Sequence, residues 1–558
     1  MTNKRKKISP EPSPPKNKAQ YIKLLKKGIT YHRNSDFINA IKHLNKAMEY
    51  DTKNSQLFML LADSLFKIDN KQAALQVMSH ALEANPDDPA NVLVLGNAAY
   101  NMQFFDLAAK IHAHHIRLSP NDPIGYNNYA TALREDGKLN EAISILQDVL
   151  PLFPQSVELW NTLGSIVAFR DGKEKAIVFF EESLKLNPEN AQALNNIAPA
   201  YYSVGNYKKA EEMIRKAIKV QPTMKDPHLY LATLLLSTRQ FKEGWEEYQW
   251  RHDAKIKLTI RFNQLPYWQG EPLKGKKIFV FCEQGIGDEI LFTWHFNELI
   301  KEADKVGIAC AERLVPLFRS SFPDAQVEKT LTKLNKQSDD IFRAFPDFNL
   351  EEFDYQCAAC DVTKYKWQSY EDIKDNIIPT LKPDQKIVKH WKKELDKLPH
   401  KISIGVAWRS GITLANRSRN YTELLNWKPL LEHPNVNYVN VQYGDCDAEL
   451  AELEEKTGIK IHNFKDLDLR DDFEATTAMM SSLDLVIGPS SAPTMQSQMA
   501  GVETWFIISG MHWWSFGEDK PKWNPKSRIL EKNDNDPWSG HMANCASELG
   551  KWLKAKRK

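Results

Sequence analysis

The 34 residues from Val157 to Asn190 read VELWNTLGSIVAFRDGKEKAIVFFEESLKLNPEN, and this stretch has counterparts along the same chain. Aligning the sequence on itself gives seven consecutive 34-residue blocks in unbroken register, which start at Tyr21, Ser55, Pro89, Pro123, Val157, Ala191 and Lys225. A fixed period of this length is typical of proteins that stack one small structural unit many times. The block therefore decides the fold of residues 21–258.

Small residues and prolines recur at fixed positions of the block. Position 8 is always glycine or alanine, position 20 is alanine until it becomes Gly244, and position 32 is proline in five consecutive blocks. Small residues let two helices approach closely, and proline ends the second helix of each pair. The pattern resembles the tetratricopeptide repeat, which implies an α superhelix whose concave surface holds an extended segment or another protein.

Beyond the blocks, short β-rich runs alternate with helical stretches. The runs are Lys277–Cys282, Val306–Cys310, Ile402–Trp408, Tyr438–Gln442, Leu485–Gly488 and Trp505–Ile508. Strands that alternate with helices in two sets predict an α/β fold of two doubly wound, Rossmann-like domains that face a cleft. Ligands, commonly nucleotides, bind such folds at the carboxyl ends of the strands.

We expect six segments along the chain. They are a disordered basic tail (1–20), seven repeats (21–258), a linker (259–274), a first Rossmann-like domain (275–385), a second (386–545), and a helix with a basic tail (546–558). The last block is rich in aromatic residues from Glu243 to Arg251, where the end of an array should be polar. This predicts a capping helix that docks on the following domain.

The first candidate site is the loop that follows the run Lys277–Cys282 and opens a helix. It contains Gln284, Gly285, Gly287 and Asp288. The two glycines permit a tight turn and close backbone approach, and the helix N-terminus presents N–H groups to an anion. The carboxylate of Asp288 is interpreted either as a helix cap or as a general base.

Two further loops follow strands in the second set. One contains three arginines, a hydroxyl and a glycine: Arg409, Ser410, Gly411, Arg417 and Arg419. Guanidinium groups bind phosphate oxygens in a bidentate fork, although a solvated loop is the alternative. The other contains Ser490, Ser491, Ala492 and Thr494 at a predicted helix start. It suits either phosphate binding or simple helix capping.

These residues, with Trp268, Gly270, Gln442 and the run Asp484–Ile487, resemble the repeat-linked glycosyltransferases of GT-B fold that are related to heptosyltransferases. The resemblance spans most of 243–540. It implies that Asp288 is the catalytic base on the acceptor side and that the second domain binds the nucleotide sugar, with Gln442 among its donor contacts. Ser490, Ser491 and Met495 depart from the Asp-Thr and His of the heptosyltransferases, so a heptose donor is not assumed.

The resemblance favours an inverting, metal-independent glycosyltransferase that needs no cofactor, with a nucleotide sugar as donor. Its acceptor would be a protein recruited by the array, as in bacterial protein O-glycosyltransferases, including those acting on flagellin. Two alternatives stay open: a scaffold that has lost activity, and a transferase for a surface glycan or lipid-linked saccharide. Three DxD spacings, at Asp445, Asp466 and Asp534, offer little support for a metal because such short patterns arise by chance.

Charge and composition argue against several classes of protein. The net charge is +2, but residues 1–18 and the last eight each carry +5, so residues 19–550 carry 2 − 10 = −8. An acidic body argues against nucleic-acid binding. No apolar run approaches the roughly 20 residues of a transmembrane helix. Six cysteines without a framework spacing, and no secretory signal, predict a soluble protein of the cytoplasm.

Overall fold

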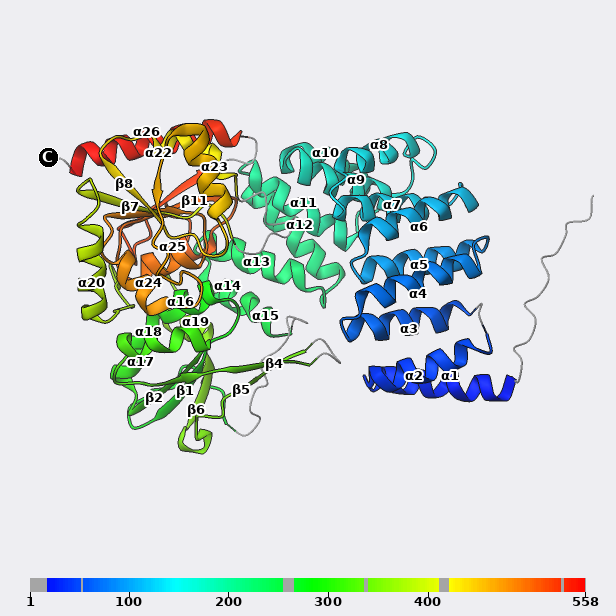
Figure 1. Ribbon diagram of the computed structural model, residues 1–558, viewed down its shortest axis with the longest axis horizontal. Helices are drawn as coiled ribbons and strands as arrows, with labels where there is room; N and C mark the ends of the chain where they lie inside the picture. Colours follow the sequence, from blue (N-terminus) through cyan, green and yellow to red (C-terminus); the bar gives the residue numbers. More distant parts are fainter. Residues whose placement is uncertain are drawn as a thin grey trace, which may run out of the picture. The chain divides into compact units, whose positions relative to one another are not determined.

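The computed structural model describes residues 18–51, 54–253, 265–335, 340–410, 421–532 and 536–556, with backbone alone at 333–335 and 340–342. Figure 1 labels the elements along the chain. The chain forms two compact units. The first contains residues 1–170, 178–188 and 334–340, and the second contains 171–177, 189–333 and 341–558. The division between them falls inside the fifth block, so the predicted domain boundaries stay predictions.

Each block of the first unit folds into two helices, which confirms the predicted repeat array. They are α1 (Lys18–Arg33), α2 (Phe37–Met48), α3 (Ser55–Lys67), α4 (Lys71–Ala84), α5 (Pro89–Asn101), α6 (Phe105–Leu118), α7 (Pro123–Glu135), α8 (Leu139–Val149), α9 (Val157–Arg170) and α10 (Lys173–Leu186). The first helices of successive blocks, α1, α3, α5, α7 and α9, pack against one another in turn. They form one layer of this part of the array, the first-helix layer.

The block sequence explains how each pair closes. Block position 15 lies in the turn between the two helices and has a positive φ of 62° to 80° at Ser35, Asp69, Gln103, Gly137, Gly205 and Arg239. Position 8 lies against position 24 of the second helix. A Cβ on Gly28, Gly96 or Gly164 would come within 2.4 to 2.7 Å of Leu44, His112 or Phe180. Small residues at position 8 are therefore required by close helix packing.

The last repeats belong to the second unit. Their helices are α11 (Ala191–Ser203), α12 (Tyr207–Val220), α13 (Lys225–Ser237), α14 (Phe241–Tyr248) and α15 (Trp250–Asp253). The indole Nε1 of the fully buried Trp245 donates to the carbonyl of Trp367 at 2.8 Å. Phe241 packs against Phe516 with ring centroids 4.9 Å apart. One hydrophobic core runs from α13 and α14 into the α/β region, which confirms the predicted docking of the last block.

The first sheet is parallel, in the order β3-β2-β1-β6. Its strands are β1 (Lys277–Phe281), β2 (Lys305–Cys310), β3 (Gln326–Lys329) and β6 (Tyr355–Ala358). Val280 pairs with Ile308 on one side and with Cys357 on the other. Helices α16 (Ile286–Leu291), α17 (Phe296–Glu302), α18 (Val315–Ser321) and α19 (Ala359–Lys366) surround it. Two further strands, β4 (Leu331–Asn335) and β5 (Asp340–Ala344), pair separately.

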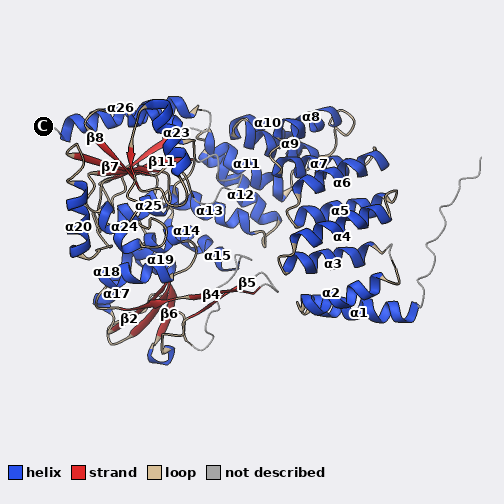
Figure 2. Ribbon diagram, viewed as in Figure 1, coloured by secondary structure: helices blue, strands red, loops and turns tan. Residues whose placement is uncertain are grey.

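The second sheet is also parallel, in the order β12-β11-β10-β7-β8-β9. Its strands are β7 (Ile402–Val406), β8 (Val436–Asn440), β9 (Ile461–His462), β10 (Leu485–Gly488), β11 (Thr504–Ser509) and β12 (Ser527–Lys532). Its helices are α20 (Gln385–Leu395), α22 (Lys428–Leu431), α23 (Asp447–Thr457), α24 (Phe473–Met480), α25 (Ala492–Met499) and α26 (Trp538–Lys556). Figure 2 shows the strands of both sheets within the α/β region.

Two expectations need correction. The carboxyl-terminal helix was expected from residue 546, but α26 begins at Trp538, because the apolar face of the helix continues through Met542 and Cys545 into the core of the second sheet. The six predicted runs are all strands, yet among the described residues β3, β4, β5, β6, β9 and β12 were missed. Within the described residues, no helix combines the length and the apolar character needed to span a membrane.

Candidate functional site

The candidate site lies where loops from the carboxyl ends of the two parallel sheets meet. Helix α16 follows β1, helix α25 follows β10, and the two helices pack against each other. A Cβ on Gly287 would lie 3.8 Å from the backbone of Ala492. Arg313, just after β2, donates to the carbonyl of Arg470 at 3.0 Å, beyond the end of β9. The structure thus brings the predicted acceptor-side loop and the Ser490–Thr494 turn side by side.

The loop after β1 is held in an unusual backbone conformation. Gln284 has a φ of 69°, a left-handed value that a side chain with a Cβ adopts only at a cost. Its side-chain amide donates to the hydroxyl of Tyr248 on α14 at 3.3 Å. Arg343 on β5 donates to the carbonyls of Cys282 and Gln284. Partners outside the loop therefore fix the peptide just before Gly285.

A buried ionic cluster anchors the residue before Gln284. Arg251 on α15, only 5% exposed, donates to Glu283 at 3.0 and 2.7 Å and also to Asp361. His252 lies 2.9 Å from Asp361, and Tyr267 donates to the same carboxylate. Burying charges is costly unless they are paired, so this cluster ties the end of the repeat array firmly to the β1 loop.

Asp288 caps its own helix. It stands at the third helical position of α16, and its Oδ2 accepts the N–H of Gly285 at 3.3 Å. Its side chain is half-buried beside Gly287. The cap that the sequence offered as an alternative is therefore present, and the role of Asp288 as a general base stays a prediction.

The neighbouring Glu289 is the more unusual carboxyl group. It is 5% exposed, and its Oε2 accepts the N–H of Ala311 at the end of β2, 2.9 Å away. Burial raises the pKa of Glu289 to about 7, because the N–H of Ala311 and the charge of Arg343 only partly offset the loss of water around the carboxylate. Perturbed carboxyl groups of this kind gather at functional sites. Glu289 is not among the site residues predicted from the sequence, because nothing in the sequence shows that its side chain is buried.

The second sheet uses its predicted donor-binding residues to hold its own loops. The guanidinium of Arg409 pairs with Glu449 at 2.6 Å, which raises the pKa of Arg409, and donates to the carbonyl of Asp445 at 2.7 Å. Gln442 is fully buried, and its Oε1 accepts the N–H groups of Trp408 and Arg409 at 3.0 Å. The side chains of Arg409 and Gln442 both hold backbone groups of the loops in place. These hydrogen bonds would have to rearrange before either side chain contacted a donor.

The turn after β10 is a helix cap. Ser491 and Thr494 form a capping box at the start of α25, and the Thr494 hydroxyl accepts the N–H of Ser491 at 3.0 Å. Thr494 is fully buried, whereas Ser490 is exposed. Ala492 and Met495 face Gly287 of the first loop. Of this predicted set, Ser490 is the hydroxyl best placed for a ligand.

The other predicted residues of the arginine-containing segment are Ser410, Gly411, Arg417 and Arg419. Ser410 is buried, and Gly411, Arg417 and Arg419 lie outside the described residues.

A hollow of about 300 Å³ opens at the ends of β8 and β9. Around it lie the amides of Asn440 and Asn463, the carboxylates of Asp445, Asp447 and Asp468, and the apolar Phe464. Across the described part of the chain, no group of three or more potential metal ligands is present.

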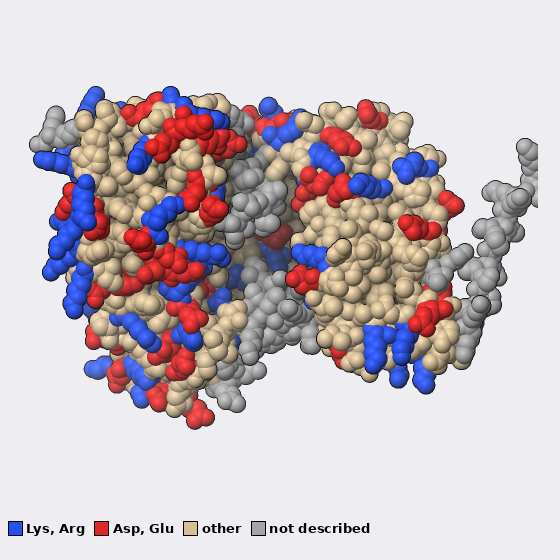
Figure 3. All heavy atoms as spheres, in the orientation of Figure 1, with Lys and Arg blue, Asp and Glu red and all other residues tan. Residues whose placement is uncertain are grey.

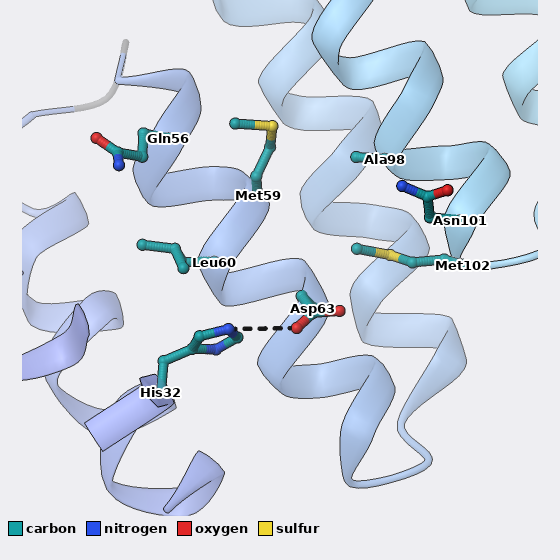
Figure 4. A pocket seen from close by; sticks show the side chains of 8 residues that line it. All are labelled: His32, Gln56, Met59, Leu60, Asp63, Ala98, Asn101 and Met102. Atoms are coloured by element: carbon teal, nitrogen blue, oxygen red, sulfur yellow. Dashed lines mark ion pairs between the residues drawn. The ribbon is translucent and has the colours of Figure 1, made fainter. Parts of the chain in front are cut away.

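The first-helix layer of the first unit has its own hollow, of about 360 Å³ (Figure 4). Met59, Leu60, Ala98 and Met102 supply apolar walls, and His32, Gln56, Asp63 and Asn101 supply polar groups. The His32 ring lies 3.4 Å from the Asp63 carboxylate, and burial lowers the pKa of His32. Flexible methionines beside amide groups suit a short peptide segment.

The known proteins that match this chain cover very different shares of it. Tetratricopeptide repeat family models match residues 31–95 and 191–224. FlbA of Caulobacter vibrioides is 31% identical over 533 residues, which cover 92% of this chain and 87% of FlbA. The probable UDP-N-acetylglucosamine–peptide N-acetylglucosaminyltransferase SPINDLY of Petunia hybrida is 32% identical over 107 residues, 19% of this chain and 12% of that protein. A solved tetratricopeptide repeat protein of Parabacteroides merdae is 14% identical, with a TM-score of 0.33, over 41% of this chain and 91% of its own.

Proposed function

The chain belongs to the same family as FlbA of Caulobacter vibrioides, and from this premise we propose that it is a glycosyltransferase of GT-B type acting on a protein acceptor. One observation carries the proposal. The β1 loop and the Ser490–Thr494 turn, from the carboxyl ends of two separate parallel sheets, pack together through Gly287 and Ala492. Crevices at such strand ends bind nucleotides and their substrates. The partial match to SPINDLY points the same way over a small part of the chain.

In this proposal the β1 loop acts on the acceptor. Asp288 takes the proton from an acceptor hydroxyl as that oxygen attacks the anomeric carbon of the donor sugar, and the bond from that carbon to the leaving phosphate oxygen breaks. Arg251, Tyr248 and Arg343 are positioning residues, because they hold Glu283 and Gln284 and so set the direction of Gly285–Asp288. A loop fixed before substrate arrives loses little entropy in the reaction.

The second sheet would bind the donor. The hollow at the ends of β8 and β9 offers carboxylates and amides that can accept from ribose hydroxyls, and its volume of about 300 Å³ is near the lower limit for a nucleoside site. Ser490, together with Arg417 and Arg419, would contact the phosphates. Catalysis would then need no metal, since positive side chains stabilise the leaving group.

The repeats would recruit the acceptor. An extended peptide would lie on the first-helix layer of the first unit, where the hollow beside Met59 and Met102 would take an apolar side chain and the amides of Gln56 and Asn101 would bond its backbone. Met59→Glu should weaken acceptor binding without changing hydrolysis of the donor. This variant separates recruitment from chemistry.

The decisive experiment compares the wild-type chain with Asp288→Asn in a transfer assay on intact acceptor protein, with the sugar followed by mass spectrometry. Loss of a general base lowers transfer by about 10² to 10⁴-fold. The amide still caps α16, so binding of donor and acceptor should persist. Transfer by Asp288→Asn at the wild-type rate would remove Asp288 from the mechanism.

A second candidate function has a specific observation in its favour. Arg409, Gln442, Ser491 and Thr494 are all committed to internal hydrogen bonds, as expected of a scaffold that keeps the transferase fold without using it. Calorimetric titration with a panel of nucleotides and nucleotide sugars distinguishes the two. Binding of one nucleotide supports the transferase, and absence of binding to all of them supports the scaffold.

A further inference from the structure

The edge of the second sheet opposite the candidate site is basic. All six strands are parallel, so their amino ends share one edge, and three of them are preceded directly by lysine: Lys401 before β7, Lys460 before β9 and Lys526 before β12. Helix α26 ends at the same edge, because Trp552 in its last turns donates to Glu503 Oε1, just before β11, at 2.7 Å. This helix adds Lys554 and Lys556.

These lysines are exposed and largely without acidic partners. Lys401, Lys460, Lys526 and Lys554 are exposed, and no ion pair with a carboxylate is found for them among the described residues. The acids nearest the edge are already engaged: Asp484, directly before β10, accepts the N–H of Ser403 at 3.0 Å. Glu503 pairs weakly with Lys556 at 3.9 Å, and Glu548 pairs with Arg528 at 2.6 Å. We call the four lysines, with Trp552, the amino-edge face.

Helix α20 extends this charge along the side of the domain. Its apolar side, with Trp391 and Leu395, packs into the domain, and its outer side carries Lys386, Lys389, Lys392 and Lys393. Figure 3 shows Lys and Arg side chains gathered along the margin of the α/β region where Figure 1 places α20 and the end of α26. The outer side of α20 therefore adds to the positive potential of the same region.

The residue types favour a lipid surface over a protein partner. Specific protein interfaces are enriched in arginine and depleted in lysine, yet the unpaired cations here are all lysines. The lysines are also spread over a sheet whose six strands span about 24 Å at the usual spacing of about 4.8 Å. Flexible lysine side chains that lie in one plane bind the headgroups of a flat anionic leaflet, and this contact needs no precise fit of shape. The half-buried indole of Trp552 suits the headgroup region.

We propose that the amino-edge face binds the surface of a membrane leaflet that contains anionic phospholipids. The attachment is electrostatic, since the apolar side of α20 is already used in the core. It orients the second sheet with its amino ends toward the lipid and its carboxyl ends, which carry Arg409, Gln442 and Ser490, away from it. This proposal does not depend on the proposed transfer reaction.

The test is co-sedimentation of the full-length chain with vesicles of phosphatidylcholine alone or with about a third phosphatidylglycerol. The wild type should sediment only with the anionic vesicles and dissociate in 0.5 M salt, where charges are screened within about 4 Å. Each lysine near an anionic surface contributes about fivefold to partitioning. Reversing the charge at four of them, by Lys401→Glu, Lys460→Glu, Lys526→Glu and Lys554→Glu, should lower binding by at least about 100-fold.

The matched control reverses four exposed lysines of the first repeats, Lys23, Lys27, Lys42 and Lys71, with the same change in net charge. The control should bind as the wild type does if the face is specific. Equal loss in both variants would mean that net charge alone governs binding, and no loss in the amino-edge variant would assign binding to the basic termini. Either result overturns the proposal, as does equal sedimentation of the wild type with both kinds of vesicle.

Discussion

The loop after β1 and the loops of the second sheet carry similar residue types but are held in opposite ways. Around β1, residues from outside the loop fix it: Arg251 and Tyr248 from the last repeat and Arg343 from β5. In the second sheet, the loops after neighbouring strands hold one another: Gln442 after β8 accepts the N–H of Trp408 after β7, and Arg409 pairs with Glu449 on α23, while Thr494 bonds within its own turn. The first arrangement makes the orientation of the loop depend on the repeat array, and the second makes the loops of the sheet depend on groups of their own domain.

The largest difference in the free energy of unfolding is expected between variants of two arginines, Arg251 beside the β1 loop and Arg409 in the second sheet. Arg251→Met leaves the carboxylates of Glu283 and Asp361 buried without their cation, and we expect a loss of about 3 to 5 kcal/mol in the free energy of unfolding. Arg409→Met removes a pair whose side chains are 23% and 31% exposed, and should cost about 1 kcal/mol or less. Urea unfolding followed by tryptophan fluorescence measures both, since all tryptophans except Trp160 lie in the second unit.

Equal losses in the two variants would contradict the comparison. Arg251→Lys serves as the conservative control, because it keeps the charge but not the fork that reaches both carboxylates. It should recover part of the stability, whereas transfer activity should stay low if the geometry of the β1 loop matters. Full recovery of both stability and transfer activity would mean that Arg251 contributes only its positive charge.

The next effect concerns the buried Glu289. Its pKa is raised to about 7 in the folded chain and is about 4.3 when unfolded, so the folded state binds more protons between these values. The free energy of unfolding should therefore decrease by about 3 kcal/mol as the pH rises from about 4.3 to 7, and change little from this group above 7. Glu289→Gln should flatten this dependence, measured as the difference between the unfolding curves of the two proteins.

Asp288→Asn is the matched control for that measurement, because its half-buried side chain is next in sequence and it caps the same helix. It should change the slope between pH 4.3 and 7 much less than Glu289→Gln does, because the charge of Asp288 is only a secondary cause of the raised pKa of Glu289. If Glu289→Gln retains the wild-type slope, the carboxyl group is ionised in the fold and is not the source of the pH dependence.

The smallest effects are expected at two hydroxyl side chains four residues apart, Ser490 and Thr494. Thr494→Val removes a buried cap of α25 and should cost about 1 kcal/mol of stability, with no change in the KM for the donor. Ser490→Ala alters an exposed side chain and should change stability by less than about 0.5 kcal/mol, but raise the KM for the donor. Thermal unfolding and steady-state kinetics of both variants check this. The reverse pattern would exchange the roles of Ser490 and Thr494.

The array could be predicted almost completely because its determinants are local and repeated. Gly28, Gly96 and Gly164 occupy the same block position since each meets a large side chain one helix later. Buried strands such as Ile402–Val406 were predictable for a similar reason, as continuous apolar runs. The strands that were missed are short or polar, such as Gln326–Lys329 and Ile461–His462, and their pairing partners are distant in sequence.

The site was predictable as a set of loops but not as a set of contacts. Ser491 and Thr494 are residue types that serve equally as helix caps and phosphate ligands, so only their geometry shows the cap. The partners of the β1 loop lie far along the chain. Glu283 is 32 residues from Arg251, which in turn reaches Asp361 110 residues away. Such pairs leave no periodic signal in a single sequence.

The shared core between the last repeats and the α/β region has a consequence for how members of this family can diverge. Duplication, loss or exchange of blocks before residue 171 alters a structure whose parts contact mainly their immediate neighbours. Blocks after residue 189 cannot be exchanged in this way, because Trp245, Phe241 and Arg251 would each lose a partner in the α/β region. We therefore expect relatives to differ in the number of early blocks more readily than in the parts of the second unit, 189–333 and 341–558, that share this core.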